Sequence, residues 1–143
     1  MSKPVHILFL CVANSARSQL AEGLAKSVFG ENAEIQSAGS RPGKLNPFAI
    51  KVMQEIGIDI SMHYSKSIDD LSPTFVIALD YIITLCAEEL CPTMVAPNAK
   101  KLHCPFADPA TPESLSNVEM LEQFRETRDG ILASLKKFQA EVL

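Results

Sequence analysis

The sequence predicts one α/β domain over residues 1–143, in which a four-stranded, mainly parallel sheet lies between two layers of helices. Apolar stretches of strand length alternate along the chain with longer segments whose apolar residues recur at helical spacing. The first of these stretches is almost continuously apolar, which is typical of a parallel strand buried on both faces. With 47% hydrophobic and 21% charged residues, the chain has enough apolar material for one core.

The first strand and the first helix are expected to follow each other closely. Residues 5–10 form the predicted strand, because Ile7 and Phe9 favour β structure. Helical spacing begins after Arg17, and Gly30 can end that helix. The apolar residues at helical spacing are Leu20, Ala21, Leu24, Ala25, Val28 and Phe29.

A second strand and a second helix come next. Residues 34–38 are a candidate strand that Gly39 closes. Asn46 can cap the second helix, with Pro47 in the first helical position, where proline is tolerated. Gly57 is the expected stop of this helix.

A long apolar stretch in the middle of the chain is too long for one ordinary strand. It spans residues 75–86 and contains one charged residue, Asp80, at which we divide it. Residues 81–85 are then predicted to be a buried strand, whereas residues 75–79 fit a strand or a helix. Residues 100–103 are the last candidate strand.

The C-terminal segment predicts one long helix docked on the core. Helix-start chemistry occurs twice, at Thr111-Pro112 and at Ser116-x-x-Glu119. An apolar stripe then runs over roughly six turns of helix. Its members are Val118, Leu121, Phe124, Ile131, Leu132, Leu135, Phe138 and Val142.

Charge and cysteine content restrict the setting in which the chain works. A net charge of −4 argues against nucleic acid or an anionic membrane as a partner. Residues 5–10 are too few to span a membrane and lack a cleavage pattern, so we expect a cytoplasmic protein. Four cysteines in a reducing compartment are expected to be reactive, metal-binding or buried rather than bridged.

The chemistry is predicted in the loop between the first strand and the first helix. Cys11 ends the strand, and Arg17 stands six positions later at the start of the helix. Backbone N–H groups of such a loop can converge on one point, where the helix N-terminus adds positive potential. An oxyanion of phosphate shape fits there, with Arg17 as a two-pronged donor. The predicted anion-binding residues are Val12, Ala13, Asn14, Ser15, Ala16, Arg17 and Ser18.

The same positive field would favour the thiolate form of Cys11 and make it a nucleophile. Ser18 can donate a hydrogen bond to that sulfur. Taken alone, a cysteine at a strand end is as often a buried hydrophobe, so that alternative stays open. A nucleoside-triphosphate loop is disfavoured, because the pattern Gly-x-x-x-x-Gly-Lys is absent.

The loop and the residues after it, Gln19-Leu20-Ala21-Glu22-Gly23, resemble the start of the low-molecular-weight protein tyrosine phosphatase superfamily. The likeness is strongest to its thioredoxin-coupled arsenate reductases, and it implies a flavodoxin-like fold and a place in arsenical resistance. Further elements occur in the order typical of the family: Ser37-Ala38-Gly39, Asn46-Pro47, residues 57–61, Thr84-Leu85-Cys86 and Asp108-Pro109.

The residues around Asp108 bear on the choice between phosphatase and reductase. The resemblance implies that Asp108 donates a proton to the departing oxygen, although Asp-Pro alone is a common turn signal. Tyrosine phosphatases of the family usually carry aromatic residues after Asp-Pro, whereas here residues 110–112 are Ala-Thr-Pro. The only tyrosines are Tyr64 and Tyr81. The pattern therefore favours a small inorganic anion, with tyrosine phosphatase as the alternative, and leaves residual phosphatase activity open.

Reduction of arsenate takes two electrons, which thiols can supply. The resemblance implies that Cys86 attacks Cys11 and that Cys91 then attacks Cys86, leaving a Cys86–Cys91 disulfide for a thioredoxin-type reductant. Four residues separate Cys86 from Cys91. A disulfide needs Cα atoms roughly 4.4–6.8 Å apart, and five steps of regular helix span more than that. We therefore expect residues 86–92 to rearrange on oxidation.

No metal or cofactor is expected. Some reductases of the family hold potassium with side chains that correspond to Asn14, Glu22 and Ser37. The further acidic ligand expected after Ser65 is Lys66 here, and its ammonium could replace the ion by pairing with Glu22.

Two other classes of function remain as alternatives. A zinc-binding interaction domain would use Cys86, Cys91, His103 and Cys104, but their spacing lacks a close Cys-x-x-Cys pair. Cys104 is by default a small buried hydrophobe. An idle anion-binding regulator is disfavoured by the intact set of reactive residues.

Overall fold

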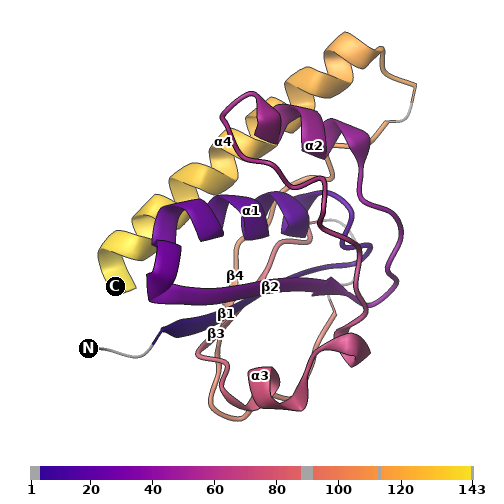
Figure 1. Ribbon diagram of the computed structural model, residues 1–143. Coiled ribbons are helices and arrows are strands. Elements are labelled where there is room, and N and C mark those ends of the chain that lie inside the picture. Colours follow the sequence, from indigo (N-terminus) through magenta and orange to yellow (C-terminus); the bar gives the residue numbers. More distant parts are fainter. Residues whose placement is uncertain (1–3, 88–91, 113, 143) are drawn as a thin grey trace.

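The computed structural model describes residues 4–87, 92–112 and 114–142. In this part of the chain four strands form one sheet with the order β2-β1-β3-β4, and every neighbouring pair is parallel. The predicted α/β architecture is confirmed, with a sheet that is parallel throughout (Figure 1). The strands are β1 Val5–Cys11, β2 Ala33–Gly39, β3 Tyr81–Thr84 and β4 Lys100–His103.

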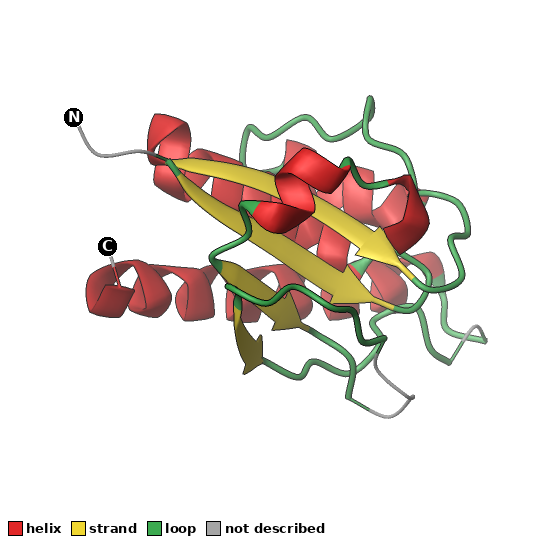
Figure 2. Ribbon diagram, turned by 90° about the horizontal axis from the view of Figure 1, so that it is seen from below, coloured by secondary structure: helices red, strands yellow, loops and turns green. Residues whose placement is uncertain are grey.

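Helices cover both faces of the sheet, so the structure has the three predicted layers (Figure 2). The long helix α4 lies on one face with two others, and the short helix α3 lies on the opposite face. Alternate residues of β1 supply the two cores: Ile7 and Phe9 face α1 and α4, whereas Leu8 and Leu10 face α3. The helices are α1 Arg17–Phe29, α2 Pro47–Gln54, α3 Pro73–Ile77 and α4 Asn117–Val142, with short 3-10 turns at Gly30–Asn32 and Ile68–Asp70.

Local capping chemistry fixes most helix ends where the sequence predicts them. The Asn46 side chain accepts a hydrogen bond from the Phe48 N–H at 2.8 Å, with Pro47 in the first helical position. Gly30 ends α1 with a φ of +54°, a value that glycine adopts readily. The helix α2 ends at Gln54, three residues before the expected Gly57, which instead lies in the turn that follows.

Of residues 75–79, predicted to be strand or helix, residues 75–77 are helical as part of α3. Ser72 caps α3 by accepting a hydrogen bond from the Phe75 N–H at 3.1 Å, and Pro73 occupies the first turn. The dipeptide Ser72-Pro73 is a helix-start signal that favours the helix over the strand.

The start of α4 follows the second of the two predicted signals. The Glu119 N–H donates to the Ser116 hydroxyl, and the Ser116 N–H donates to the Glu119 carboxylate, both at 3.2 Å. The assignment of Val118 to the buried stripe is wrong, because its side chain is 71% exposed. The first buried residue is Met120, which lies two positions, or about 200°, farther round the helix. Val142, at the end of α4, is also exposed.

Although α4 has 26 residues, charged side chains occur along its whole length. No helix in the described ranges is long and apolar enough to cross a membrane.

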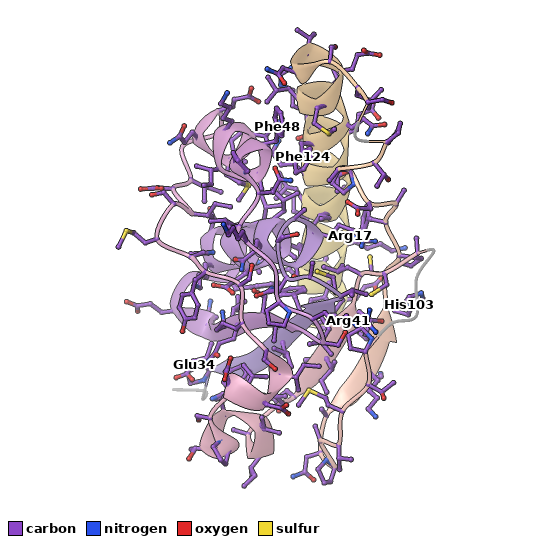
Figure 3. The ribbon with its side chains drawn as sticks, turned by 90° about the vertical axis from the view of Figure 1, so that its right-hand side faces the viewer. Arg17, Glu34, Arg41, Phe48, His103 and Phe124 are labelled. Carbon is purple, nitrogen blue, oxygen red and sulfur yellow. The ribbon has the colours of Figure 1, made fainter. Side chains whose placement is uncertain are left out.

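Helix α4 is joined to α2 by an aromatic contact and an ion network. The rings of Phe48 and Phe124 lie 5.7 Å apart (Figure 3). Arg125 and Arg128 both bind the Glu55 carboxylate, the shortest distances being 2.7 and 2.9 Å. Arg128 also donates to the Val52 carbonyl at 2.8 Å and is buried. Hydrogen bonds from Arg125, opposed by partial desolvation and reinforced by Arg128, lower the pKa of Glu55 to about 2.

This network makes part of the stability of the fold depend on pH. Because the pKa of Glu55 is about 2 in the folded state and 4.5 ordinarily, its contribution is complete above pH 4.5 and is lost as the pH falls toward 2. We expect Glu55→Gln to lower the melting temperature at pH 7, and we expect the difference from the parent to shrink below pH 4.5.

Thermal denaturation of both proteins across this pH range tests the expectation. Glu126→Gln, at an exposed position of α4, is the control and should leave the melting temperature nearly unchanged. A difference between Glu55→Gln and the parent that stays constant down to the lowest pH would contradict the assignment.

Candidate active site

The carboxyl ends of the strands meet at one edge of the sheet, because the strands are parallel. Cys11 is the last residue of β1, and α1 begins at this edge with Arg17. Figure 3 views the molecule from the side toward which the strand arrows of Figure 1 point, with Arg17, Arg41 and His103 on that side. Ligand sites of open parallel sheets lie outside this edge.

The Cys11 sulfur is buried and hydrogen-bonded. It lies 2.8 Å from the hydroxyl oxygen of Ser18, in the first turn of α1. The same hydroxyl oxygen accepts a hydrogen bond from the Asn14 side-chain amide at 2.7 Å. Since the Asn14 amide nitrogen can only donate, the hydroxyl hydrogen of Ser18 is free to point at the Cys11 sulfur. This arrangement suits a thiolate, which needs donors around it.

Backbone hydrogen bonds hold the peptide planes of the loop from outside. The carbonyls of Val12, Ala13 and Ser15 each accept one N–H bond at 2.9 Å. A trans peptide carries its N–H opposite its C=O, so the amides of the same peptide planes point away from these partners. The outer donors belong to Arg41, Gly43 and Asn46, all between β2 and α2.

Two residues with unusual backbone demands allow this packing. Asn14 has a φ of +51°, in the left-handed region that asparagine tolerates better than most residues. Its side-chain oxygen accepts the Lys66 N–H at 2.8 Å, and its carbonyl accepts the Ser65 hydroxyl at 2.7 Å. Gly39 ends β2 so close to the loop that a Cβ would lie 2.3 Å from the Val12 carbonyl oxygen. Only glycine fits there.

Arg17 is 4% exposed and is brought to the site by the start of α1. Its Nη1 donates to the backbone carbonyl of Phe106 at 2.8 Å. The contact joins the cysteine loop to the segment between β4 and α4, which also carries Asp108. No local pattern predicts Phe106 as a partner of Arg17, because the two residues are 89 positions apart.

Asp108 is half-buried in that segment. Its carboxylate accepts the Ala110 N–H at 2.9 Å, and no hydrogen bond joins it to residues 11–18 in the described part of the chain. Gln123 of α4 holds the segment by donating to the carbonyls of Pro109 and Thr111, at 3.0 and 2.9 Å.

Cys86 is buried, two residues beyond the end of β3. Because β3 pairs directly with β1, Cys86 and Cys11 leave neighbouring strands at the same edge. The Leu85 N–H donates to the Leu10 carbonyl at 2.9 Å and extends this pairing to the residue before Cys86. Cys91 lies outside the described residues, as does most of the segment expected to rearrange, so the Cys86–Cys91 pairing stays a prediction.

Cys104 is less buried than the expected core position. It is half-buried and packs against the core between the sheet and α4. No three His, Cys, Asp or Glu side chains gather as metal ligands within the described ranges. The zinc alternative gains no support there, although one of its four ligands, Cys91, is not described.

A buried carboxylate lies behind the loop. Glu22 is 4% exposed and contacts the Ser37 hydroxyl at 2.6 Å and the Lys26 ammonium at 2.7 Å. The Lys66 ammonium lies 3.6 Å from it, as predicted, and the His63 ring nitrogen lies 3.5 Å away. Burial alone would raise the pKa of Glu22, but the hydrogen bonds from Lys26 and Ser37 and the charge of Lys66 hold it below its ordinary value.

His63 was overlooked as a member of this cluster. Its ring nitrogen lies 3.1 Å from the Gln19 side-chain oxygen, and Gln19 in turn donates to Asn14. Burial lowers the pKa of His63, and the charge of Glu22 offsets this only in part. Residues of two distant segments thus brace the cysteine loop. No local pattern in the sequence pointed to this contact.

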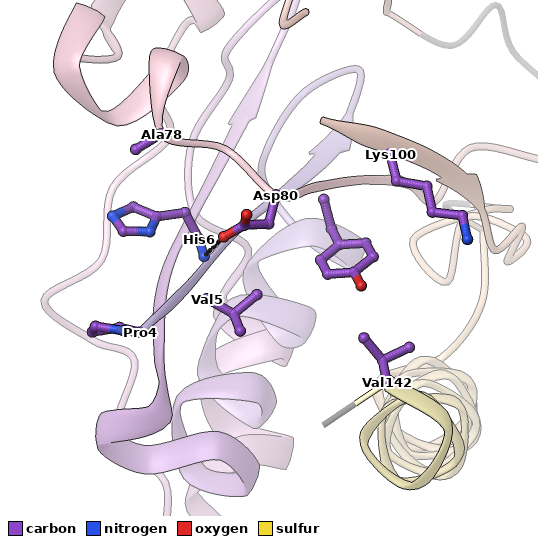
Figure 4. A pocket seen from close by; sticks show the side chains of 8 residues that line it. Pro4, Val5, His6, Ala78, Asp80, Lys100 and Val142 are labelled. Atoms are coloured by element: carbon purple, nitrogen blue, oxygen red, sulfur yellow. Dashed lines mark hydrogen bonds between the residues drawn. The ribbon is translucent and has the colours of Figure 1, made fainter. Parts of the chain in front are cut away.

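A cavity of about 470 Å³ lies at the opposite edge of the sheet, among Pro4, His6, Asp80 and Lys100 (Figure 4). The His6 N–H donates to the Asp80 carboxylate at 2.9 Å there. Tyr81 also lines this cavity. The cavity is therefore not part of the cysteine site.

Known proteins are similar to this chain over nearly its whole length. The family described as low molecular weight phosphotyrosine protein phosphatase matches residues 6–143. The arsenate reductase of Bacillus licheniformis is 44% identical over 140 residues, which cover 96% of both chains.

Solved structures agree in fold. An arsenate reductase in its phosphate-binding state superposes with a TM-score of 0.78 at 29% identity, over 97% of this chain and 99% of that one. A thioredoxin-dependent arsenate reductase of Corynebacterium glutamicum gives a TM-score of 0.67 at 29% identity, over 99% of this chain and 65% of that one. The family match extends from β1 through the end of α4, and so the chain belongs to the low molecular weight phosphotyrosine protein phosphatase family.

Proposed function

We propose that the protein is an arsenate reductase that uses Cys11 as its nucleophile. The observation that carries this proposal is the chain of hydrogen bonds from Asn14 through Ser18 to the Cys11 sulfur, at the start of a helix. It favours the thiolate in the place where loop amides and Arg17 can bind an oxyanion. Identity of 44% to an arsenate reductase over nearly the whole chain supports arsenate as that oxyanion.

The first step joins sulfur to arsenic. Arsenate binds in the loop with its oxygens toward the backbone amides and the Arg17 guanidinium, and the Cys11 thiolate attacks arsenic. A sulfur–arsenic bond forms and an arsenic–oxygen bond breaks. Asp108 is assigned to protonate the departing oxygen, which leaves as water.

The second step transfers two electrons. The Cys86 thiolate attacks the Cys11 sulfur, a sulfur–sulfur bond forms, and the sulfur–arsenic bond breaks with its electron pair remaining on arsenic. Arsenic is reduced from the +5 to the +3 state and leaves as arsenite. Cys91 then attacks Cys86, which releases the Cys11 thiolate and leaves the Cys86–Cys91 disulfide.

A dithiol protein of the thioredoxin type would reduce this disulfide. The relative from Corynebacterium glutamicum is thioredoxin-dependent and supports this assignment. We place the protein in the cytoplasm, the compartment in which such reductants keep thiols reduced.

Tyrosine phosphatase is the second candidate, because the family includes such enzymes and phosphate shares the shape of arsenate. The positions of the two tyrosines weigh against it. Tyr81 begins β3, at the edge of the sheet opposite Cys11, and its ring packs against Phe138. Tyr64 lines the same surface pocket as Glu22, and the Lys66 ammonium lies 5.1 Å from its ring centre. Neither supplies a wall for a phenol ring beside Asp108.

The role of Cys86 is tested by arsenate-dependent oxidation of NADPH with thioredoxin and its reductase. We expect turnover in the parent and none in Cys86→Ser, because no thiol would release arsenite. Hydrolysis of p-nitrophenyl phosphate should survive in this variant, since it needs only the loop and the acid. Arsenate turnover in Cys86→Ser at the parent rate would refute the cascade.

The assignment of Asp108 leads to a separate expectation. Asp108→Asn cannot donate the proton, so kcat for arsenate should fall by about 10²-fold or more, with a smaller change in KM. Steady-state kinetics measure both values. A variant with the parent kcat would exclude Asp108 as the proton donor.

The position of Lys66 beside Glu22 suggests that the site works without a monovalent metal ion. We expect the parent to turn over equally fast in KCl and in NaCl at fixed ionic strength, because the ammonium already balances the buried carboxylate. Lys66→Asp places a second carboxylate there and should make activity depend on potassium. Stimulation of the parent by potassium would contradict the expectation.

A further inference from the structure

Among the described residues between β4 and α4, Phe106 contacts Arg17 through its backbone carbonyl. The Phe106 N–H donates to the Leu85 carbonyl at 3.0 Å, and the Phe106 carbonyl accepts from Arg17 at 2.8 Å. The backbone of Phe106 thus lies between the end of β3 and the guanidinium. A displacement of the Phe106 backbone would therefore change the direction of this hydrogen bond to Arg17.

The ring of Phe106 rests on a glycine of α4. A Cβ on Gly130 would lie 2.8 Å from Cε1 of the ring and 3.7 Å from its two neighbouring atoms, Cδ1 and Cζ. Glycine is unfavourable in the interior of a helix, and this one lies in the middle of α4. Its presence there has a packing reason, because any larger residue would collide with the ring.

The Phe106 ring also borders an unfilled space. Phe106 lines an apolar cavity of about 340 Å³ between the sheet and α4, together with Cys104, Leu102 and Ile131. This cavity leaves the ring room to move, whereas at Gly130 the ring lies so close to α4 that a Cβ would collide with it.

We propose that Phe106 and Gly130 are positioning residues for oxyanion binding. The ring, seated on Gly130, sets the Phe106 carbonyl, and the carbonyl aims the Arg17 guanidinium at the anion. This inference rests on the proposed role of Arg17 in holding the oxyanion. It assigns to α4, which supplies no predicted site residue, control over the affinity of the site.

The change Gly130→Ala tests the inference without breaking the fold, since the displaced ring can move into the cavity. The readout is protection of Cys11 from iodoacetamide by inorganic phosphate, followed peptide by peptide with mass spectrometry. We expect the phosphate concentration for half-protection to rise roughly tenfold or more, as for a misaligned charge-assisted hydrogen bond. Ser134→Ala removes one oxygen atom from the wall of the same cavity and is the control. In this variant phosphate should protect Cys11 at the same concentration as in the parent.

A double-mutant cycle separates positioning from general damage. Phe106→Leu removes the ring and should weaken protection by itself. The double variant Gly130→Ala with Phe106→Leu should bind phosphate no more weakly than the weaker single variant, because both act through one contact. The inference is overturned if the half-protection concentration of the double variant rises by the product of the two single increases.

The outcomes distinguish this inference from the proposed function. If phosphate protects Cys11 in the parent and equally in Gly130→Ala, with equal melting temperatures, only the inference is overturned. If phosphate fails to protect Cys11 in the parent, the oxyanion site itself is refuted, and this inference is refuted with it. Neither result depends on arsenate reduction or on the identity of the reductant.

Discussion

The site depends on the hydrogen bonds that hold the carbonyls of the cysteine loop from outside. Three carbonyls between Cys11 and Arg17 accept hydrogen bonds from the segment that follows β2. The N–H groups of the same peptide planes therefore point the other way. The approach is close enough that Gly39 must lack a side chain. The loop that we propose to bind the oxyanion is therefore held in place by the surrounding fold, and binding need not pay for ordering it.

A second layer of polar contacts keeps Asn14 in its left-handed conformation. Gln19, Ser65 and the Lys66 backbone all bond to Asn14, and Gln19 also contacts His63 beside the buried Glu22. No buried side-chain nitrogen or oxygen among the described residues lacks a hydrogen-bond partner. A satisfied network of this kind is rigid, because moving one member leaves another buried polar group unpaired.

The remaining parts of the site come from the opposite end of the chain. Helix α4 holds the segment with Phe106 and Asp108 through Gln123 and through the contact at Gly130. The same helix is fixed to α2 by the ion network around Glu55. Asp108 and the carbonyl that binds Arg17 thus lie in one segment, and α4 holds that segment in place.

The sequence by itself determined the strands, the cysteine loop and the helix caps at Asn46 and Ser116, since these depend on residues within a few positions of one another. Tertiary structure decided which face of α4 is buried, so that Met120 rather than Val118 enters the core. It also decided the contacts of Arg17 with Phe106 and of Gln19 with His63, which join residues 89 and 44 positions apart. Such contacts follow from how the layers pack, and no local periodicity or spacing encodes them.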